Sequence, residues 1–181
     1  MSWLRRAVFL DRDGVLNEAI VRNGKPRSPL RLQEVVIPDG VPEALRALKK
    51  AGFVLICVTN QPDVARGIQR REAVEAINAA LVARLPLDGI LVCYHDDQDG
   101  CSCRKPQPGL ILQAAGEHTI DLRRSFVIGD RWRDIEAGRQ AGCLTIRLQR
   151  HYTEQEPETS PDYVSHSLTE AASWILSRDA P

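Results

Sequence analysis

The feature that most constrains this chain is a short apolar run that ends in two acidic residues. Residues 7–10 read Ala-Val-Phe-Leu, and Asp11 and Asp13 follow at once. A run of this length, bounded by a turn, is typical of a strand that is buried on both faces of a parallel sheet. Because such sheets bind ligands at the carboxyl ends of their strands, we expect both carboxylates to face a crevice. A strand followed by an ordinary Asp-Gly turn is the alternative for this segment taken alone.

Length and composition limit the classes of protein to which the chain can belong. Its 181 residues, 43% of them hydrophobic, suffice for the core of one domain, so we expect residues 1–181 to form a single domain. Lys plus Arg and Asp plus Glu both number 24, and no basic stripe indicates a nucleic-acid partner. No apolar run could span a bilayer or serve as a signal-peptide core, which predicts a cytoplasmic protein without a membrane partner. We also expect a monomer.

Short apolar runs alternate with amphipathic patterns along the chain, which indicates an α/β protein with a parallel sheet covered by helices. The predicted strands cover residues 7–10, 53–58, 89–93, 125–128, 144–148 and 163–164. The predicted helices cover the segment between Gly40 and Gly52 and residues 71–85, 108–118, 135–141 and 169–177. Residues 18–37 have no sustained periodicity and are expected to form a loop. A separate cap domain would need several times as many residues.

Polar residues follow each of the first four predicted strands of the sheet. They are Asp11 and Asp13, then Thr59-Asn60-Gln61, then Tyr94-His95 leading to Arg104-Lys105, and then Asp130 with Asp134. In a parallel sheet these strand ends converge on one site. Together they provide the groups that phosphoryl transfer requires: a nucleophile, a proton shuttle, carboxylates for Mg²⁺, and donors for the phosphoryl oxygens.

These residues carry a resemblance to the haloacid dehalogenase superfamily of phosphohydrolases. The matching motifs are Asp11-Arg12-Asp13-Gly14, Thr59-Asn60, Lys105, and Gly129-Asp130 followed by Asp134. The resemblance runs from about residue 7 to residue 148. It implies a Rossmann-like three-layer sandwich with a mostly parallel sheet and no separate cap domain.

The same resemblance implies a role for each catalytic residue. Asp11 corresponds to the nucleophile that forms an aspartyl phosphate. Asp13 corresponds to the acid that protonates the leaving alcohol and later activates water. Thr59 and Lys105 correspond to the residues that hold the transferring phosphoryl group.

The resemblance also implies a magnesium cofactor. The ion would be held by the Asp11 carboxylate, the backbone carbonyl of Asp13, and Asp130. Asp134 is expected to orient Lys105 or a metal-bound water rather than to bind the ion directly.

A second cluster has the spacing of a structural zinc site. Cys93 and His95 are followed by Cys101 and Cys103, immediately before Arg104. Three thiols and one imidazole form a closed tetrahedral Zn²⁺ site with no open position for catalysis. We therefore expect a structural ion that orders a polar loop and positions the basic residues after it. An exposed loop with fortuitous cysteines is the alternative reading.

The zinc loop and the motifs at residues 59–61, 65–67 and 103–106 are similar to one subfamily, the bacterial D-glycero-D-manno-heptose 1,7-bisphosphate 7-phosphatases and the related histidinol-phosphate phosphatases. The resemblance implies an enzyme of lipopolysaccharide biosynthesis that removes the 7-phosphate. Lys105 would serve the phosphate being cleaved, and the planar guanidinium of Arg104 would hold the other. The candidate substrate-binding residues are Asn17, Asn60, Gln61, Arg66, Arg104 and Arg131.

The chain departs from the heptose phosphatases at a few positions, and two other functions stay open. Pro62-Asp63 follows the Thr-Asn-Gln motif where Ser-Gly is common, and Tyr94 replaces a frequent Pro. A histidinol-phosphate phosphatase would need to accommodate a cationic amine, which Arg104 and Arg131 would repel. A non-catalytic sugar-phosphate-binding module would have little reason to keep the acid pair.

Overall fold

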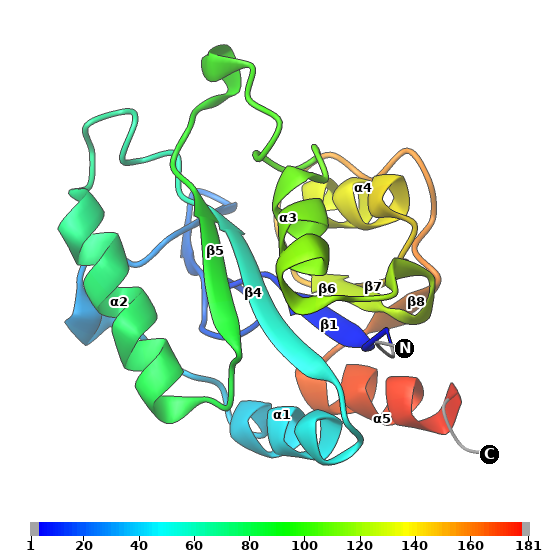
Figure 1. Cartoon of the computed structure of the whole chain (residues 1–181). Helices are drawn as coiled ribbons and strands as arrows, with labels where there is room; N and C mark the ends of the chain where they lie inside the picture. The colour runs from blue at the N-terminus through cyan, green and yellow to red at the C-terminus, as the bar shows by residue number, and fades with distance from the viewer. Residues whose placement is uncertain (1–3, 179–181) are drawn as a thin grey trace.

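A six-stranded parallel sheet forms the centre of the structure, a computed structural model that describes residues 4–178 (Figure 1). The strand order is β5-β4-β1-β6-β7-β8, and every neighbouring pair is parallel. The strands are β1 (Ala7–Leu10), β4 (Val54–Asn60), β5 (Gly89–Cys93), β6 (Phe126–Gly129), β7 (Leu144–Leu148) and β8 (Tyr163–Ser165). The arrangement confirms the predicted α/β fold with a mostly parallel sheet.

Helices cover both faces of the sheet and complete three layers (Figure 1). One face packs against α1 (Val41–Lys50), α2 (Arg71–Arg84) and α5 (Leu168–Arg178) through a core that includes Leu10, Leu45, Leu55, Ile77 and Ile175. The other face packs against α3 (Gly109–His118) and α4 (Trp132–Ala141) through Phe9, Ile56, Val58, Ile111 and Ala137. Side chains alternate between the two faces along β1 and β4, as the two-residue period of a strand requires.

The register of the central strands brings their polar ends together. Leu10, the last residue of β1, lies opposite Cys57 of β4 and Ile128 of β6. Asp11, directly after β1, and Thr59, near the end of β4, therefore reach the same edge of the sheet. This edge is where an α/β sheet binds its ligands.

The segment between β1 and α1 contains more regular structure than the sequence predicts. The strands β2 (Ile20–Arg22) and β3 (Lys25–Arg27) form an antiparallel hairpin, and a 3-10 turn over Leu32–Glu34 follows. Each strand has only three residues, which is too short to produce a visible periodicity. The hairpin is a small insertion, and within residues 4–178 no separate cap domain stands between β1 and α1.

Two further loops extend beyond the carboxyl edge of the sheet. The loop after β5 contains a 3-10 turn at Asp97–Asp99, and the segment from 149 to 162 connects β7 to β8 (Figure 1). The amide of Thr153 in that second segment donates a hydrogen bond of 2.8 Å to the carbonyl of Gly24 at the hairpin turn. Among residues 4–178 no helix has the length and apolar composition that a membrane span requires.

Candidate active site

Lys105 lies between two carboxylates at the carboxyl edge of the sheet. Its Nζ is 2.7 Å from Oδ1 of Asp11 and 2.6 Å from Oδ1 of Asp134, and it donates a further bond of 2.7 Å to the carbonyl of Val58. Burial alone would lower the pKa of Lys105, but the two carboxylates raise it above its ordinary value. Lys105 is therefore a fixed ammonium ion that touches the side chain predicted to be the nucleophile.

Asp11 is buried, and its pKa is raised. Burial is the main cause, the ammonium of Lys105 opposes it, and the charges of Asp134 and Asp13 add to it, so that the pKa lies at about 6. The amide of Asp11 donates to the carbonyl of Ile128 at 2.9 Å and continues the ladder between β1 and β6. The backbone thus fixes the carboxylate at the point where three strands end.

Asp130 and Asp134 complete a group of three buried carboxylates. One oxygen from each of Asp11, Asp130 and Asp134 lies within 4.8 Å of the others. Asp134 also accepts a bond of 3.0 Å from the amide of Arg131 and so caps the first turn of α4. Asp134 therefore has two anchoring partners, Lys105 and the helix end.

Asp130 has the environment of a metal ligand. Neither of its buried oxygens accepts a hydrogen bond of ordinary geometry among the described residues, although the hydroxyl of Tyr152 interacts with the carboxylate. Burial, followed by the charges of Asp11 and Asp134, raises the pKa of Asp130 well above its ordinary value. Buried carboxylates are usually paired or coordinate metals.

The charge balance of this cluster fits a divalent cation. In their ionised forms Asp11, Asp130 and Asp134 carry three negative charges, and Lys105 is the only cation among residues 4–178 that is bonded to them. A cation of charge two would neutralise the excess, and Mg²⁺ prefers carboxylate oxygens of this kind. The donor set therefore fits the magnesium site predicted from the sequence.

Asp13 is held by a network of hydrogen-bond donors. Arg12 donates to both carboxylate oxygens at 3.1 Å, Asn17 to Oδ1 at 2.9 Å, and Gln61 and Ser28 to Oδ2 at 2.9 and 2.7 Å. Burial alone would raise the pKa of Asp13, but the Arg12 guanidinium and the other donors lower it. The network fixes the orientation of the carboxylate next to the nucleophile.

Asn17 and Gln61 lie behind Asp13 and not on the wall of the cavity that opens in front of it. Both side chains are buried, with exposed fractions of 0% and 1%. Gln61 donates to Oγ1 of Thr59 as well as to Asp13, in both cases at 2.9 Å. Their contacts in this structure are therefore with catalytic candidates, whereas the sequence assigned them to the substrate.

Thr59 and Asn60, at the end of β4, do line the cavity. Asn60 exchanges two hydrogen bonds with the backbone of Lys105, at 3.0 and 3.1 Å. This reciprocal pair attaches the loop of Lys105 to the strand of Thr59. It explains how a lysine 46 residues further along the chain than Thr59 reaches the same site.

A cavity of about 470 Å³ opens in front of these groups. Its volume lies within the range of small-molecule sites. The hairpin, the loop after β4, the loop after β5, the start of α4 and the segment from 149 to 162 form its wall. The charged residues that line it are Asp11, Asp13, Lys25, Arg27, Asp63, Arg66, Asp97, Arg104, Lys105, Arg131, Arg133, Asp134 and Glu154.

The three arginines predicted to bind substrate all line this cavity, and each already has an acidic partner. Arg66 donates to both oxygens of Asp96 at 2.8 and 2.6 Å. Arg104 donates to Asp97 at 2.9 and 3.3 Å and is only 9% exposed. Arg131 forms a bidentate pair with Glu154.

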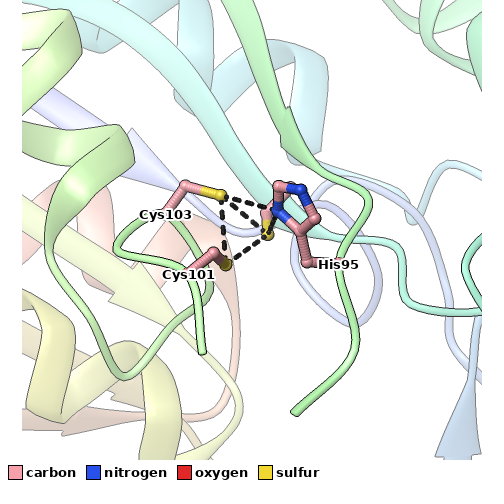
Figure 2. Close-up of side chains that lie close together, drawn as sticks. His95, Cys101 and Cys103 are labelled. Carbon is pink, nitrogen blue, oxygen red and sulfur yellow. Dashed lines mark hydrogen bonds between the residues drawn. The ribbon is translucent and has the colours of Figure 1, made fainter. Parts of the chain in front are cut away.

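The predicted zinc ligands come together in one cluster (Figure 2). The sulfur of Cys103 lies 3.0 Å from that of Cys93 and 3.4 Å from that of Cys101, and 3.3 Å from Nδ1 of His95. A tetrahedral ion with Zn–S bonds of about 2.3 Å separates its sulfur ligands by about 3.8 Å. The three sulfur–sulfur separations, 3.0, 3.4 and 3.7 Å, are shorter than this value. The four ligand atoms therefore lie together as in a zinc site and would move apart slightly around an ion.

The chemistry of the cluster also suits a metal. All three of its cysteines are free thiols. Burial alone would raise the pKa of Cys101, but hydrogen bonds from Cys103 and from backbone amides lower it to about 7, which favours the thiolate that a metal binds. Cys103 directly precedes Arg104 and Lys105, so an ion here would fix the start of the segment that carries the buried ammonium.

Several residues of this site were not identified from the sequence. Arg12 is fully buried and donates to Asn78 of α2 at 2.9 Å as well as to Asp13. Its position in the sequence between the two catalytic acids is the one feature from which its role could have been predicted. Ser28 and Glu154 come from segments without periodicity, and no sequence pattern links them to Asp13 or Arg131.

The comparisons with known proteins agree with this geometry. A family model described as HAD-hydrolase-like matches residues 102–171. A D-glycero-β-D-manno-heptose-1,7-bisphosphate 7-phosphatase from Yersinia pestis is 37% identical over 95% of this chain and 96% of its own. The enzyme of the same name from Escherichia coli strain K12 is 35% identical over 97% of this chain and 96% of its own.

A solved structure leads to the same family. The crystal structure of D,D-heptose 1.7-bisphosphate phosphatase from B. bronchiseptica, complexed with magnesium and phosphate, superposes with a TM-score of 0.81 and 29% identity. The match covers 96% of this chain and 99% of that one. The identity and coverage of these relatives, together with the acid cluster, confirm the resemblance predicted from the sequence: the chain belongs to the heptose-1,7-bisphosphate 7-phosphatase family of HAD-like hydrolases.

Proposed function

We propose that this chain is a Mg²⁺-dependent phosphatase that removes the 7-phosphate from D-glycero-D-manno-heptose 1,7-bisphosphate through a phosphorylated Asp11. The observation that carries the proposal is the buried cluster of Asp11, Asp130, Asp134 and Lys105 at the base of the cavity. Family membership supports the reaction and the substrate.

In the first half of the reaction, a carboxylate oxygen of Asp11 attacks the phosphorus of the 7-phosphate. A bond forms between Asp11 and phosphorus, and the bond from phosphorus to the sugar oxygen breaks. The donors around Asp13 lower its pKa in the free site, so Asp13 has to take up a proton as the charged substrate binds. It then gives this proton to the sugar oxygen, and the product leaves as an alcohol. Thr59 and Lys105 hold the phosphoryl oxygens while charge develops on them.

In the second half, Asp13 acts as a base. It takes a proton from water, and the resulting hydroxide adds to the phosphorus of phospho-Asp11. The bond between Asp11 and phosphorus breaks, inorganic phosphate leaves, and both acids return to their starting forms. The buried donors around Asp13 support this step because they fix its orientation.

Both metal sites belong to the proposal. Asp11, the backbone carbonyl of Asp13, and Asp130 would hold Mg²⁺, which would supply charge neutralisation at the phosphoryl group. Magnesium is present with phosphate in the B. bronchiseptica structure, which supports this assignment. Cys93, His95 and the two later cysteines, Cys101 and Cys103, would hold a structural Zn²⁺.

The network around Asp13 supports a positioning role for Asn17 and Gln61. Each donates to that carboxylate from a buried position. We assign them to the acid and base function of Asp13 and not to the sugar. Arg66, Arg104 and Arg131 remain candidates for the sugar-phosphate wall of the cavity.

We also propose that residues 1–181 act as one hydrolase domain. The two apolar cores lie on opposite faces of the same sheet, and in one of them α1, from the first half of the chain, shares a core with α5, from the second half. One cooperative unfolding transition, coincident by circular dichroism and tryptophan fluorescence, is the expected result. Two separated transitions would contradict a single domain.

Phosphate release from parallel reactions tests the proposed substrate. Both anomers of the heptose bisphosphate and histidinol phosphate are compared with Mg²⁺, and the Asp11→Asn protein serves as the control. The proposal expects turnover of one heptose anomer at a kcat/KM well above that for histidinol phosphate. A preference for histidinol phosphate would contradict the substrate, and release by Asp11→Asn would contradict the mechanism.

A further inference from the structure

The cavity has two basic side chains that no acid of the structure neutralises. Five of its seven cations form ion pairs, namely Arg66, Arg104, Lys105, Arg131 and Arg133. The other two, Lys25 and Arg27, take part in no ion pair or side-chain hydrogen bond with another residue among 4–178. Both are exposed to solvent at the cavity wall.

The hairpin places the charges of Lys25 and Arg27 on the same face of strand β3. Lys25 and Arg27 are two residues apart on β3, so their side chains leave the same face of the strand. Arg22 of β2 lies directly opposite Lys25 in the ladder and adds a third positive charge to that face. Like charges in directly opposite positions repel each other, and a bound anion would offset this repulsion.

The hairpin is also held in place relative to the catalytic groups. Ser28, the residue after Arg27, donates to Asp13 at 2.7 Å. At the other end, the carbonyl of Gly24 accepts the amide of Thr153 from the segment after β7. The two cations therefore lie on a short element that is attached at both ends to the walls of the cavity.

We infer that Lys25 and Arg27 bind the phosphate of the substrate that is not cleaved. The inference rests on the proposed function, because a second phosphate monoester has to be present on the substrate. That phosphate can form ion pairs with Lys25 and Arg27 without breaking any ion pair that is present in the structure. Binding to Arg104 would instead compete with Asp97, which already accepts two bonds from that guanidinium.

The assignment makes the hairpin the element that selects a bisphosphate. A monophosphate has no group for Lys25 and Arg27 and gains no affinity from the hairpin. A substrate with a cationic amine at the same distance from its phosphate would be repelled by both side chains.

The experiment compares two substrates that share the phosphate being cleaved. Kinetic constants are measured for the heptose 1,7-bisphosphate and the heptose 7-phosphate with the wild-type protein and with Lys25→Gln/Arg27→Gln. Loss of two charged contacts should lower kcat/KM for the bisphosphate by roughly 10- to 100-fold, mainly through KM, and leave the value for the 7-phosphate unchanged. The matched control, Lys50→Gln/Arg84→Gln, removes two exposed charges from α1 and α2 and should change neither value.

Each outcome separates this inference from the proposed function. The inference is supported if the preference for the bisphosphate over the 7-phosphate is lost in Lys25→Gln/Arg27→Gln and kept in the control variant. An unchanged preference in Lys25→Gln/Arg27→Gln overturns it and leaves the proposed function intact. If the wild-type protein cleaves the heptose 7-phosphate with the same kcat/KM as the bisphosphate, no second phosphate is recognised and the inference is overturned. If it cleaves neither substrate, the proposed function is overturned together with the inference.

Discussion

Oγ of Ser28 lies 2.7 Å from Oδ2 of Asp13 and donates a hydrogen bond to it. The bond links the inserted hairpin to the residue proposed to move the proton in both halves of the reaction. Ser28→Ala should therefore lower kcat by about 3- to 30-fold, the range expected when a carboxylate loses one neutral donor. The measurement is steady-state hydrolysis of the heptose bisphosphate. Ser173→Ala, on the outer side of α5, is the control, and an unchanged kcat in Ser28→Ala would contradict the role of this bond.

Gln61 is predicted to act on every substrate alike. Because its amide contacts Asp13 and Thr59 from a buried position, Gln61→Met should lower kcat by about the same factor, ~10-fold or more, for the heptose bisphosphate and for p-nitrophenyl phosphate. Direct contact with the sugar would give the opposite pattern, with a loss confined to the heptose substrate and seen mainly in KM. Kinetic constants for the two substrates measured side by side decide between the two patterns.

Gly14 contacts the proposed magnesium site. It has φ +90, and a Cβ added to it would lie 2.0 Å from Oδ2 of Asp130. Gly14→Ala should displace that carboxylate and raise the Mg²⁺ concentration needed for half-maximal activity by more than about tenfold. Magnesium titrations of activity provide the measurement.

Gly52 supplies a matched control for that variant. Its φ of +87 is nearly the same, but no atom lies within 4 Å of an added Cβ. Gly52→Ala should have only the backbone cost, about 1 kcal/mol of unfolding free energy, and an unchanged Mg²⁺ requirement. Equal Mg²⁺ requirements in the two variants would refute the specific role of Gly14.

The zinc cluster is predicted to stabilise the loop that carries Lys105. Cys103→Ser should release the ion and lower both the melting temperature and kcat/KM, because the ion is expected to order this polar loop. Elemental analysis of protein purified without chelator should give about one zinc per wild-type chain and much less for the variant. Ser102→Ala, between the two ligands of the same loop, should keep the metal. A wild-type protein free of zinc would contradict the site.

Much of the fold and of the candidate catalytic site could be predicted from the sequence, because the signals are local. Parallel strands are short and apolar, so the buried strand β1 and the half-buried edge strand β5 both lie where the sequence places them. Functional groups follow directly on these strands, and the parallel topology then brings Asp11 and Thr59 to one edge. The zinc cluster could be predicted because its ligands lie within eleven residues, Cys93 to Cys103.

The rest depends on contacts between segments that are far apart in the sequence. The hairpin has strands of three residues, too short for a period of two to be visible. The helix α4 begins at Trp132, three residues earlier than predicted, because Asp134 caps its first turn as well as contacting Lys105. The acidic partners of Arg104 and Arg131 lie on loops, and no sequence pattern predicts that these loops come close to the two arginines.

Detection of the phosphorylated enzyme is the most direct test of the proposed Asp11 nucleophile. Wild-type protein is mixed with Mg²⁺ and excess heptose 1,7-bisphosphate, quenched in acid within the first turnovers, and digested for mass spectrometry. We predict one phosphoryl group on the peptide that contains Asp11, and none in Asp11→Asn, which should release no phosphate. Steady release of phosphate by the wild-type protein without modification of that peptide, or by Asp11→Asn, would contradict the phospho-Asp11 mechanism.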